Sequence, residues 1–113
     1  MPKYAVTASH TAEHWALLME HPEAAVLGLQ RAVEAVGAEL EVMYFVLGEH
    51  DLLAVVDAPD ELTQAAISVA MASTGVFRSF ATHQLVEPAD LAAVMSKAAD
   101  TGVGSCVADE QDG

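Results

Sequence analysis

The sequence predicts an α+β fold of the ferredoxin-like type, with an antiparallel four-stranded sheet in β-α-β-β-α-β order and an extra C-terminal helix. Segments with the apolar pattern of strands and segments with the apolar period of helices follow one another in that order. Proline and glycine stand at most of the boundaries between them. The length of 113 residues suits one domain and not comfortably two.

The first part of the chain predicts one strand and two helices. Residues 3–9 alternate between the two faces expected of a strand, and residues 11–20 follow as a short helix. Pro22 then breaks the chain, because proline is tolerated in the first turn of a helix and is costly inside one. A second helix is expected over 22–36, with Gly37 as its left-handed C-cap.

The middle of the chain predicts a hairpin of two strands, 39–47 and 51–57. The link between them is short and begins with Gly48, as hairpin turns often do. The second strand is continuously apolar from Leu52 to Val56, which predicts burial on both of its faces.

The last part predicts a helix over 58–73, a strand over 76–86 and a final helix over 88–98. The apolar side chains expected to point inward from the first of these helices are Leu62, Ala66, Val69 and Ala70. Residues 1–98 are therefore expected to form the domain. Residues 99–113, rich in glycine and acids, are expected to form an acidic flexible tail.

The charge of the chain excludes several classes of partner. The formal net charge is −13, with only four lysines and arginines, so we expect no nucleic-acid binding and no binding to anionic membranes. We also expect no membrane-spanning segment and no secretory signal. Cys106 is the single cysteine, which fits a reducing compartment, and the expected location is cytoplasmic.

The predicted sheet carries apolar residues on both faces, while its helices can cover only one. The residues that indicate this are Met43, Phe45, Leu47, Leu53 and Val55. A large bare apolar face is not stable in water, and pairing two sheets face to face removes it. We therefore expect a homodimer or a higher homo-oligomer.

The chain resembles the GYD-domain family of small bacterial and archaeal proteins. The resemblance covers about residues 1–95 and rests on M-P-K-Y, on L-E-V-M-Y-F-V-L-G-E-H-D-L-L-A-V-V, on D-A-P-D, and on T-H-Q-L-V-E-P-A-D. His50 stands where the family's Gly-Tyr-Asp motif has tyrosine, and Glu87 stands where the family has threonine. The resemblance implies a dimeric α/β-barrel. It implies no activity, because the family is largely without an assigned one and the related barrels range from heme-binding proteins to small monooxygenases.

The hairpin Gly48-Glu49-His50-Asp51 is the first candidate site. His50 can act as a catalytic base or as a ligand-binding group, with Asp51 as a second ligand-binding residue. The alternative is turn chemistry, in which Gly48 supplies a positive φ and the acids keep the hairpin soluble.

His10 and His14 form the second candidate site. Their spacing places both on one face of a helix, as in metal-binding helices. Zinc usually needs three or four protein ligands, so His21, His50 or His83 would have to complete the site. The alternative is a pair of solvent-exposed histidines.

Three further residues lie on predicted strands. His83 is the second candidate for a catalytic base. Arg78 can anchor a carboxylate ligand or pair with an internal acid such as Glu41. Tyr44 can line a ligand cavity or simply belong to the core.

These observations predict a protein that binds a small molecule or a cofactor of unknown identity between sheet and helices or between subunits. Three alternatives stay open. One is a cofactor-independent oxygenase, isomerase or cyclase with a histidine base. The others are a metal-binding protein that uses His10 and His14, and an assembly module that docks through its last helix and acidic surface.

Overall fold

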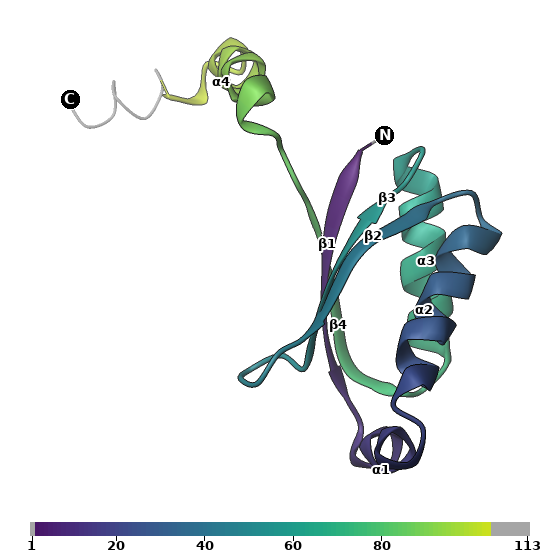
Figure 1. Ribbon diagram of the computed structural model, residues 1–113. Coiled ribbons are helices and arrows are strands. Elements are labelled where there is room, and N and C mark those ends of the chain that lie inside the picture. The colour runs from purple at the N-terminus through teal and green to yellow at the C-terminus, as the bar shows by residue number, and fades with distance from the viewer. Residues whose placement is uncertain (1, 105–113) are drawn as a thin grey trace.

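The computed structural model describes residues 2–104, and the structural statements below concern that part of the chain. The elements are β1 (Lys3–His10), α1 (Ala12–Glu20), α2 (Glu23–Ala35), β2 (Glu39–Phe45), β3 (Leu52–Asp57), α3 (Glu61–Ser73), β4 (Phe77–Gln84), the short 3-10 helix η1 (Pro88–Asp90) and α4 (Leu91–Asp100). The four antiparallel strands are ordered β2-β3-β1-β4, with α2 and α3 on one face (Figure 1). The predicted ferredoxin-like α+β fold is confirmed. Of the predicted tail, 105–113 lies outside the described residues.

Side-chain caps and glycines set the helix ends. Thr11 caps α1 by accepting a hydrogen bond from the backbone N–H of His14 at 3.2 Å. Asp60 caps α3 by accepting one from the N–H of Thr63 at 2.7 Å, and the hydrogen bonds from Thr63 hold the pKa of Asp60 below its usual value. Gly37 follows α2 with φ 80°, the left-handed conformation predicted for it.

The connection between β2 and β3 differs from the prediction. Gly48 does not adopt a positive φ, which among the described residues occurs only at Gly37, Gly75 and Gly102. The strands end earlier than expected, at Phe45, and resume at Leu52. A six-residue loop over 46–51 therefore replaces the tight turn, because a longer loop needs no left-handed residue to reverse the chain.

The core lies between the sheet and helices α2 and α3. In β1 the buried residues Tyr4, Val6 and Ala8 alternate with less buried ones. In β3 buried and half-buried residues alternate in the same way. The predicted burial of β3 on both faces is therefore wrong, because Leu53 and Val55 face away from the helices and are only half-buried.

No helix of the described chain is long and apolar enough to cross a membrane.

Helix α3 is rotated relative to the prediction. Leu62 and Val69, expected to point inward, are 81% and 69% exposed, and Ala66 and Ala70 are exposed as well. The buried residues are instead Gln64, Ile67 and Met71. The helix is rich in small and apolar residues on several sides, so its sequence did not determine which side would meet the sheet.

No helix of residues 2–104 lies on the opposite face of the sheet (Figure 1). We call it the open face and define it by residues that are paired across the four strands and alternate with the core residues: Ala5, Thr7, Val42, Tyr44, Leu53, Val55, Ala81 and His83. Most of these side chains are apolar, and Tyr44 is 61% exposed. The prediction that both faces of the sheet are apolar is confirmed.

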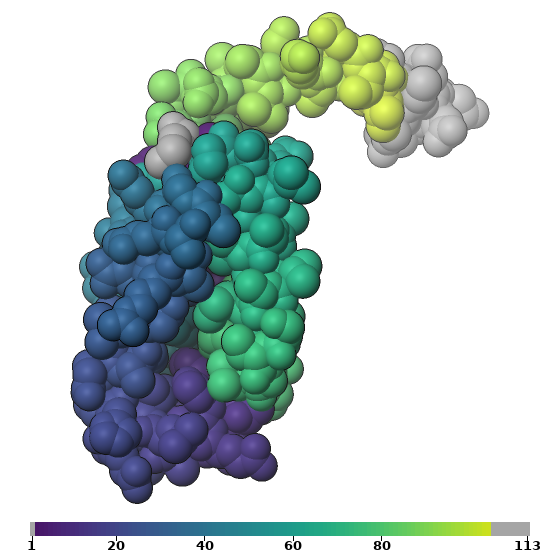
Figure 2. All heavy atoms as spheres, turned by 90° about the vertical axis from the view of Figure 1, so that its right-hand side faces the viewer, coloured from purple at the N-terminus to yellow at the C-terminus, as the bar shows by residue number. Residues whose placement is uncertain are grey.

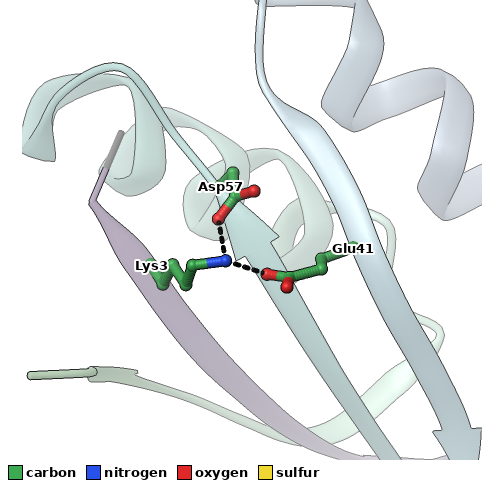
Figure 3. Close-up of polar contacts among 3 residues, drawn as sticks. All are labelled: Lys3, Glu41 and Asp57. Carbon is green, nitrogen blue, oxygen red and sulfur yellow. Dashed lines mark hydrogen bonds and ion pairs between the residues drawn. The ribbon is translucent and has the colours of Figure 1, made fainter. Parts of the chain in front are cut away.

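A small charged cluster connects three strands near the start of β1. Lys3 Nζ lies 2.6 Å from Glu41 Oε2 and 3.4 Å from Asp57 Oδ1 (Figure 3). The hydrogen bond to Glu41 is the main cause of the raised pKa of Lys3. The expectation that Glu41 pairs with Arg78 is therefore wrong. Arg78 is exposed and makes no ion pair within the described residues.

Candidate functional site

A cavity of about 300 Å³ lies between the sheet and the two covering helices. Small residues of α2 and α3 leave this space open, because they bring little side-chain volume to the layer that they face. The residues lining the cavity are His10, His14, Ala24, Ala25, Gly28, Leu29, Ala32, Leu52, Ala70, Met71, Thr74, Val76 and Phe77. Among the described residues, the lining contains two histidines and no lysine, arginine, aspartate or glutamate.

The two histidines lie side by side at this cavity. His10 is the last residue of β1 and is 4% exposed, while His14 lies in the first turn of α1. Their ring centroids are 5.2 Å apart and the rings are stacked at 26°. The expectation that both share one helix face is wrong, because His10 belongs to a strand. The connection between β1 and α1, which is the single residue Thr11, brings the rings together instead.

An aromatic cluster holds the ring of His10. The centroid of Trp15 lies 5.0 Å from it in an edge-on arrangement, and that of Phe77 lies 5.3 Å away. The Nδ1 atoms of His10 and His14 are both buried, and neither ring forms a hydrogen bond within the described residues. Burial is the main cause of a lowered pKa of His10, reinforced by His14 and opposed by Asp51. A neutral imidazole can both donate and accept a hydrogen bond.

Asp51 positions this arrangement from the loop between β2 and β3. Its Oδ2 accepts hydrogen bonds from the backbone N–H of His10 at 2.9 Å and from Trp15 Nε1 at 3.3 Å. The backbone N–H of Asp51 donates to the carbonyl of Ala8 at 2.9 Å. Asp51 thus ties the loop to the end of β1 and to α1. It does not line the cavity itself.

The stability of the protein is expected to fall as the pH is lowered through about 6.5, because of His10. A histidine whose pKa is lowered by folding binds fewer protons in the folded state, so its contribution is complete above the unfolded pKa near 6.5. That contribution is lost as the pH falls toward the pKa of His10 in the folded state. For one proton, the free energy of unfolding can decrease by at most about 1.4 kcal/mol per pH unit. Urea unfolding at several pH values measures it. His10→Phe should flatten the profile, and an unchanged profile would contradict this assignment.

The other predicted site residues lie outside the cavity. His50 is half-buried in the loop between β2 and β3, and its Nδ1 has no partner among the described residues. Tyr44 and His83 lie on the open face, on the two edge strands and two residues apart in register, so they are separated by roughly 16 Å at the usual strand spacing and rise. His83 Nε2 lies 3.5 Å from Thr7 Oγ1. His50 and His83 lie toward opposite ends of β1, whose pairing places His83 beside Ala5.

The structure gives limited support to a metal site. Within residues 2–104 no group of three or more His, Cys, Asp or Glu side chains is placed to hold a metal ion. His21 is exposed on the far end of α1, and its only ion-pair partner among these residues is Glu23, at 3.9 Å. A metal bound by His10 and His14 would therefore need further ligands from outside the described chain.

Sequence reasoning missed the roles of two residues near the cavity. Trp15 was expected, like the other aromatics, to line a ligand cavity or to belong to the core. In the structure it does not line this cavity, and its indole connects Asp51 to the ring of His10. Gly28 was not singled out, although it lies in the middle of α2, where glycine has a poor helix propensity. A Cβ atom built at Gly28 would meet nothing within 4 Å. An interior helical glycine was the signal that could have pointed to a cavity.

Comparisons with solved structures support the fold. A structure described as FFRP-DM1 superimposes with a TM-score of 0.54 at 16% identity, covering 76% of this chain and 100% of that one. The structure of MtbAldR gives a TM-score of 0.58 at 12% identity, covering 76% of this chain and 53% of the other. A 5-chloro-2-hydroxyhydroquinone dehydrochlorinase from Burkholderia phenoliruptrix AC1100, in complex with 2,5-dihydroxybenzoquinone, gives 0.53 at 10% identity, covering 75% and 94%.

At these identities the likeness concerns the fold alone, and no curated protein matches the chain. The family comparison is more specific. The model of the GYD domain matches residues 4–95, a range that begins at the second residue of β1 and ends halfway along α4. The chain belongs to the GYD domain family.

Proposed function

We propose that this protein binds a small, uncharged and largely apolar molecule in the cavity between the sheet and helices α2 and α3. The observation that carries the proposal is a mostly apolar cavity with two histidine rings in its wall that form no hydrogen bond within the described chain. Buried polar groups normally have partners, and a hydroxyl or carbonyl group of a ligand would supply one.

The size and charge of the cavity narrow the ligand class. An apolar cavity of roughly 150 Å³ is known to hold one benzene molecule, so about 300 Å³ suits two fused rings or one substituted ring. The part of the lining that the structure describes contains no lysine or arginine to pair with an anionic ligand, and the net charge of −13 repels anions from a distance. The dehydrochlorinase of similar fold, determined with a dihydroxybenzoquinone, supports a hydroxylated ring as a first probe.

The test compares binding of 2-naphthol and naphthalene by isothermal titration calorimetry. His10→Phe replaces the imidazole by a phenyl ring, which keeps an aromatic ring at this position but removes both ring nitrogens. We expect it to weaken 2-naphthol binding about 10-fold or more, because the ligand hydroxyl loses its partner, while naphthalene binds as before. His21→Phe makes the same change at an exposed position and should alter neither affinity.

Two results would contradict the proposal. One is that neither probe binds the wild-type protein and that a wider set of neutral hydroxylated rings also fails to bind. The other is that His10→Phe and His21→Phe affect 2-naphthol equally. Elemental analysis of the untagged protein belongs to the same experiment, because a metal at a fixed ratio per chain would favour the alternative of a metal-binding protein.

We further propose that the protein is a homodimer paired through the open face. The support is the apolar character of that face, which no helix of the described chain covers. Catalysis with His50 or His83 as a base stays an alternative. A pH-rate profile with an apparent pKa near that of histidine would favour it.

A further inference from the structure

Helix α4 stands apart from the rest of the molecule. Its main contacts are with the adjoining η1, and none of its residues is buried. One side of the helix is nevertheless apolar, with Leu91, Val94 and Met95 exposed by 49%, 42% and 56%. An isolated ten-residue helix is marginal in water, so its apolar side needs a surface to pack on.

Within residues 2–104 the body of the same chain provides little of that surface, because only Val94 borders a shallow cleft with Pro2, Lys3 and Gln84. Leu85 still belongs to the sheet, since its N–H donates to the carbonyl of Lys3 at 2.9 Å, but the chain then leads away from the body. The radius of gyration is 18.3 Å, against about 13 Å for a compact domain of this length. Figure 2 shows α4 projecting beyond the end of the body.

The side on which α4 lies indicates what it packs on. Helices α2 and α3 cover one side of the sheet, and α4 lies beyond its end and toward the other side, that of the open face (Figure 1). A second sheet packed on the open face would lie about 10 Å from the first, in the space that α4 borders. A second copy of this chain would thus bring apolar surface to α4.

The area of the open face supports the same assignment. Four strands of about seven residues give a flat projection of roughly 400 Å², at the usual strand spacing and rise. Stable interfaces bury about 800 Å² on each partner. A pleated face with side chains has more accessible area than its flat projection, so the open face supplies part of that value, and the apolar side of α4 would add to the contact twice, once from each chain.

We infer that α4 is an intersubunit strap, in which each chain packs the side formed by Leu91, Val94 and Met95 on the body of its partner. This inference rests on the homodimer proposed above. It explains why α4, at the end of the domain, has an apolar side that its own chain leaves exposed. It also predicts that α4 contributes to dimer affinity and not to the stability of the isolated chain.

The test is sedimentation equilibrium of the full-length protein and of a triple variant, Leu91→Ser with Val94→Ser and Met95→Ser. We expect the dimer dissociation constant to rise at least 100-fold, because three apolar side chains per chain leave the interface. Ala93→Ser lies on another side of α4 and serves as the control, with less than a threefold effect. Urea unfolding of the dissociated chains should give the same free energy for the triple variant and the wild type.

The outcomes separate this inference from the proposal on which it rests. If the wild type is a monomer at all concentrations, both are overturned. If the wild type is a dimer whose affinity the triple variant leaves unchanged, the strap is wrong and the dimer stands. If the triple variant mainly destabilises the isolated chain, α4 packs on its own body and the strap is wrong.

Discussion

Val55→Glu is expected to convert the protein from a dimer to a monomer, with a rise of at least 1000-fold in the dissociation constant. Val55 lies in the middle of the open face, on β3, paired with Ala5 on one side and Val42 on the other. In the proposed dimer it is covered by the partner sheet, so a glutamate there would be buried without a cationic partner. Such burial costs several kcal/mol, and the two-fold symmetry doubles it.

The control for this variant is Val69→Glu. Val69 is 69% exposed on α3, on the helical side of the molecule, so the same substitution changes the charge equally without touching the open face. Both variants should fold, since Val69 is exposed and Val55 is only half-buried in the monomer, which leaves each glutamate access to water. Analytical ultracentrifugation distinguishes the two species, and a Val55→Glu variant that dimerises like the wild type would show that the open face is not the interface.

The dependence of dimerisation on ionic strength provides a second test, which compares the wild type with Val55→Glu. The net charge of −13 opposes association, so the wild-type dimer should become tighter as the ionic strength rises. Screening weakens repulsion between exposed charges but does little for a carboxylate buried without a partner. High salt should therefore leave Val55→Glu monomeric. Recovery of the dimer in high salt would mean that long-range repulsion, and not burial, separates the chains.

Gly28→Leu is expected to abolish ligand binding, with a loss of at least 100-fold in the affinity for 2-naphthol. Gly28 lines the cavity from the middle of α2, and the space around a Cβ atom there is empty to 4 Å. A leucine side chain would occupy part of the space that the ligand needs. Leucine also has a better helix propensity than glycine, so the variant should be at least as stable as the wild type.

Gly28→Ala is the matched control, since it changes the helix propensity in the same direction and adds only a methyl group. It should raise the free energy of unfolding by about 1 kcal/mol and leave the affinity within a few-fold of the wild type. Calorimetry and urea unfolding of the three proteins give both quantities. Equal ligand binding by Gly28→Leu and Gly28→Ala would place the ligand outside this cavity, whatever the role of His10.

The order of the elements could be predicted because local signals marked their ends. Pro22 separated α1 from α2, Gly37 ended α2 and Asp60 capped α3, and each of these acts through contacts within a few residues. The alternation predicted for β1 is also found in the structure, where Tyr4, Val6 and Ala8 form the core side, because side chains of a strand can point only to two faces. The turn after β2 was less well predicted, since its six residues carry no single strong turn signal.

The candidate site could be predicted only in part. The spacing of His10 and His14 correctly predicted that the two rings lie close together, but it wrongly placed both on one helix. In the structure His10 ends β1 and His14 lies in α1. Asp51 was expected to bind a ligand, and in the structure it holds the backbone of His10 and the indole of Trp15. These contacts join residues about forty positions apart, and no local pattern records such a separation.

The sequence by itself determined the fold class, the element order, the apolar character of both sheet faces and the acidity of the surface. These follow from periodicity, caps and composition, which are properties of neighbouring residues. Only the tertiary structure decided which side of α3 faces the sheet, where small residues leave a cavity, and that α4 stands away from its own body. Each of these depends on how whole elements pack against one another. Several packings satisfy the same apolar pattern, and the volumes of side chains distant in sequence select among them.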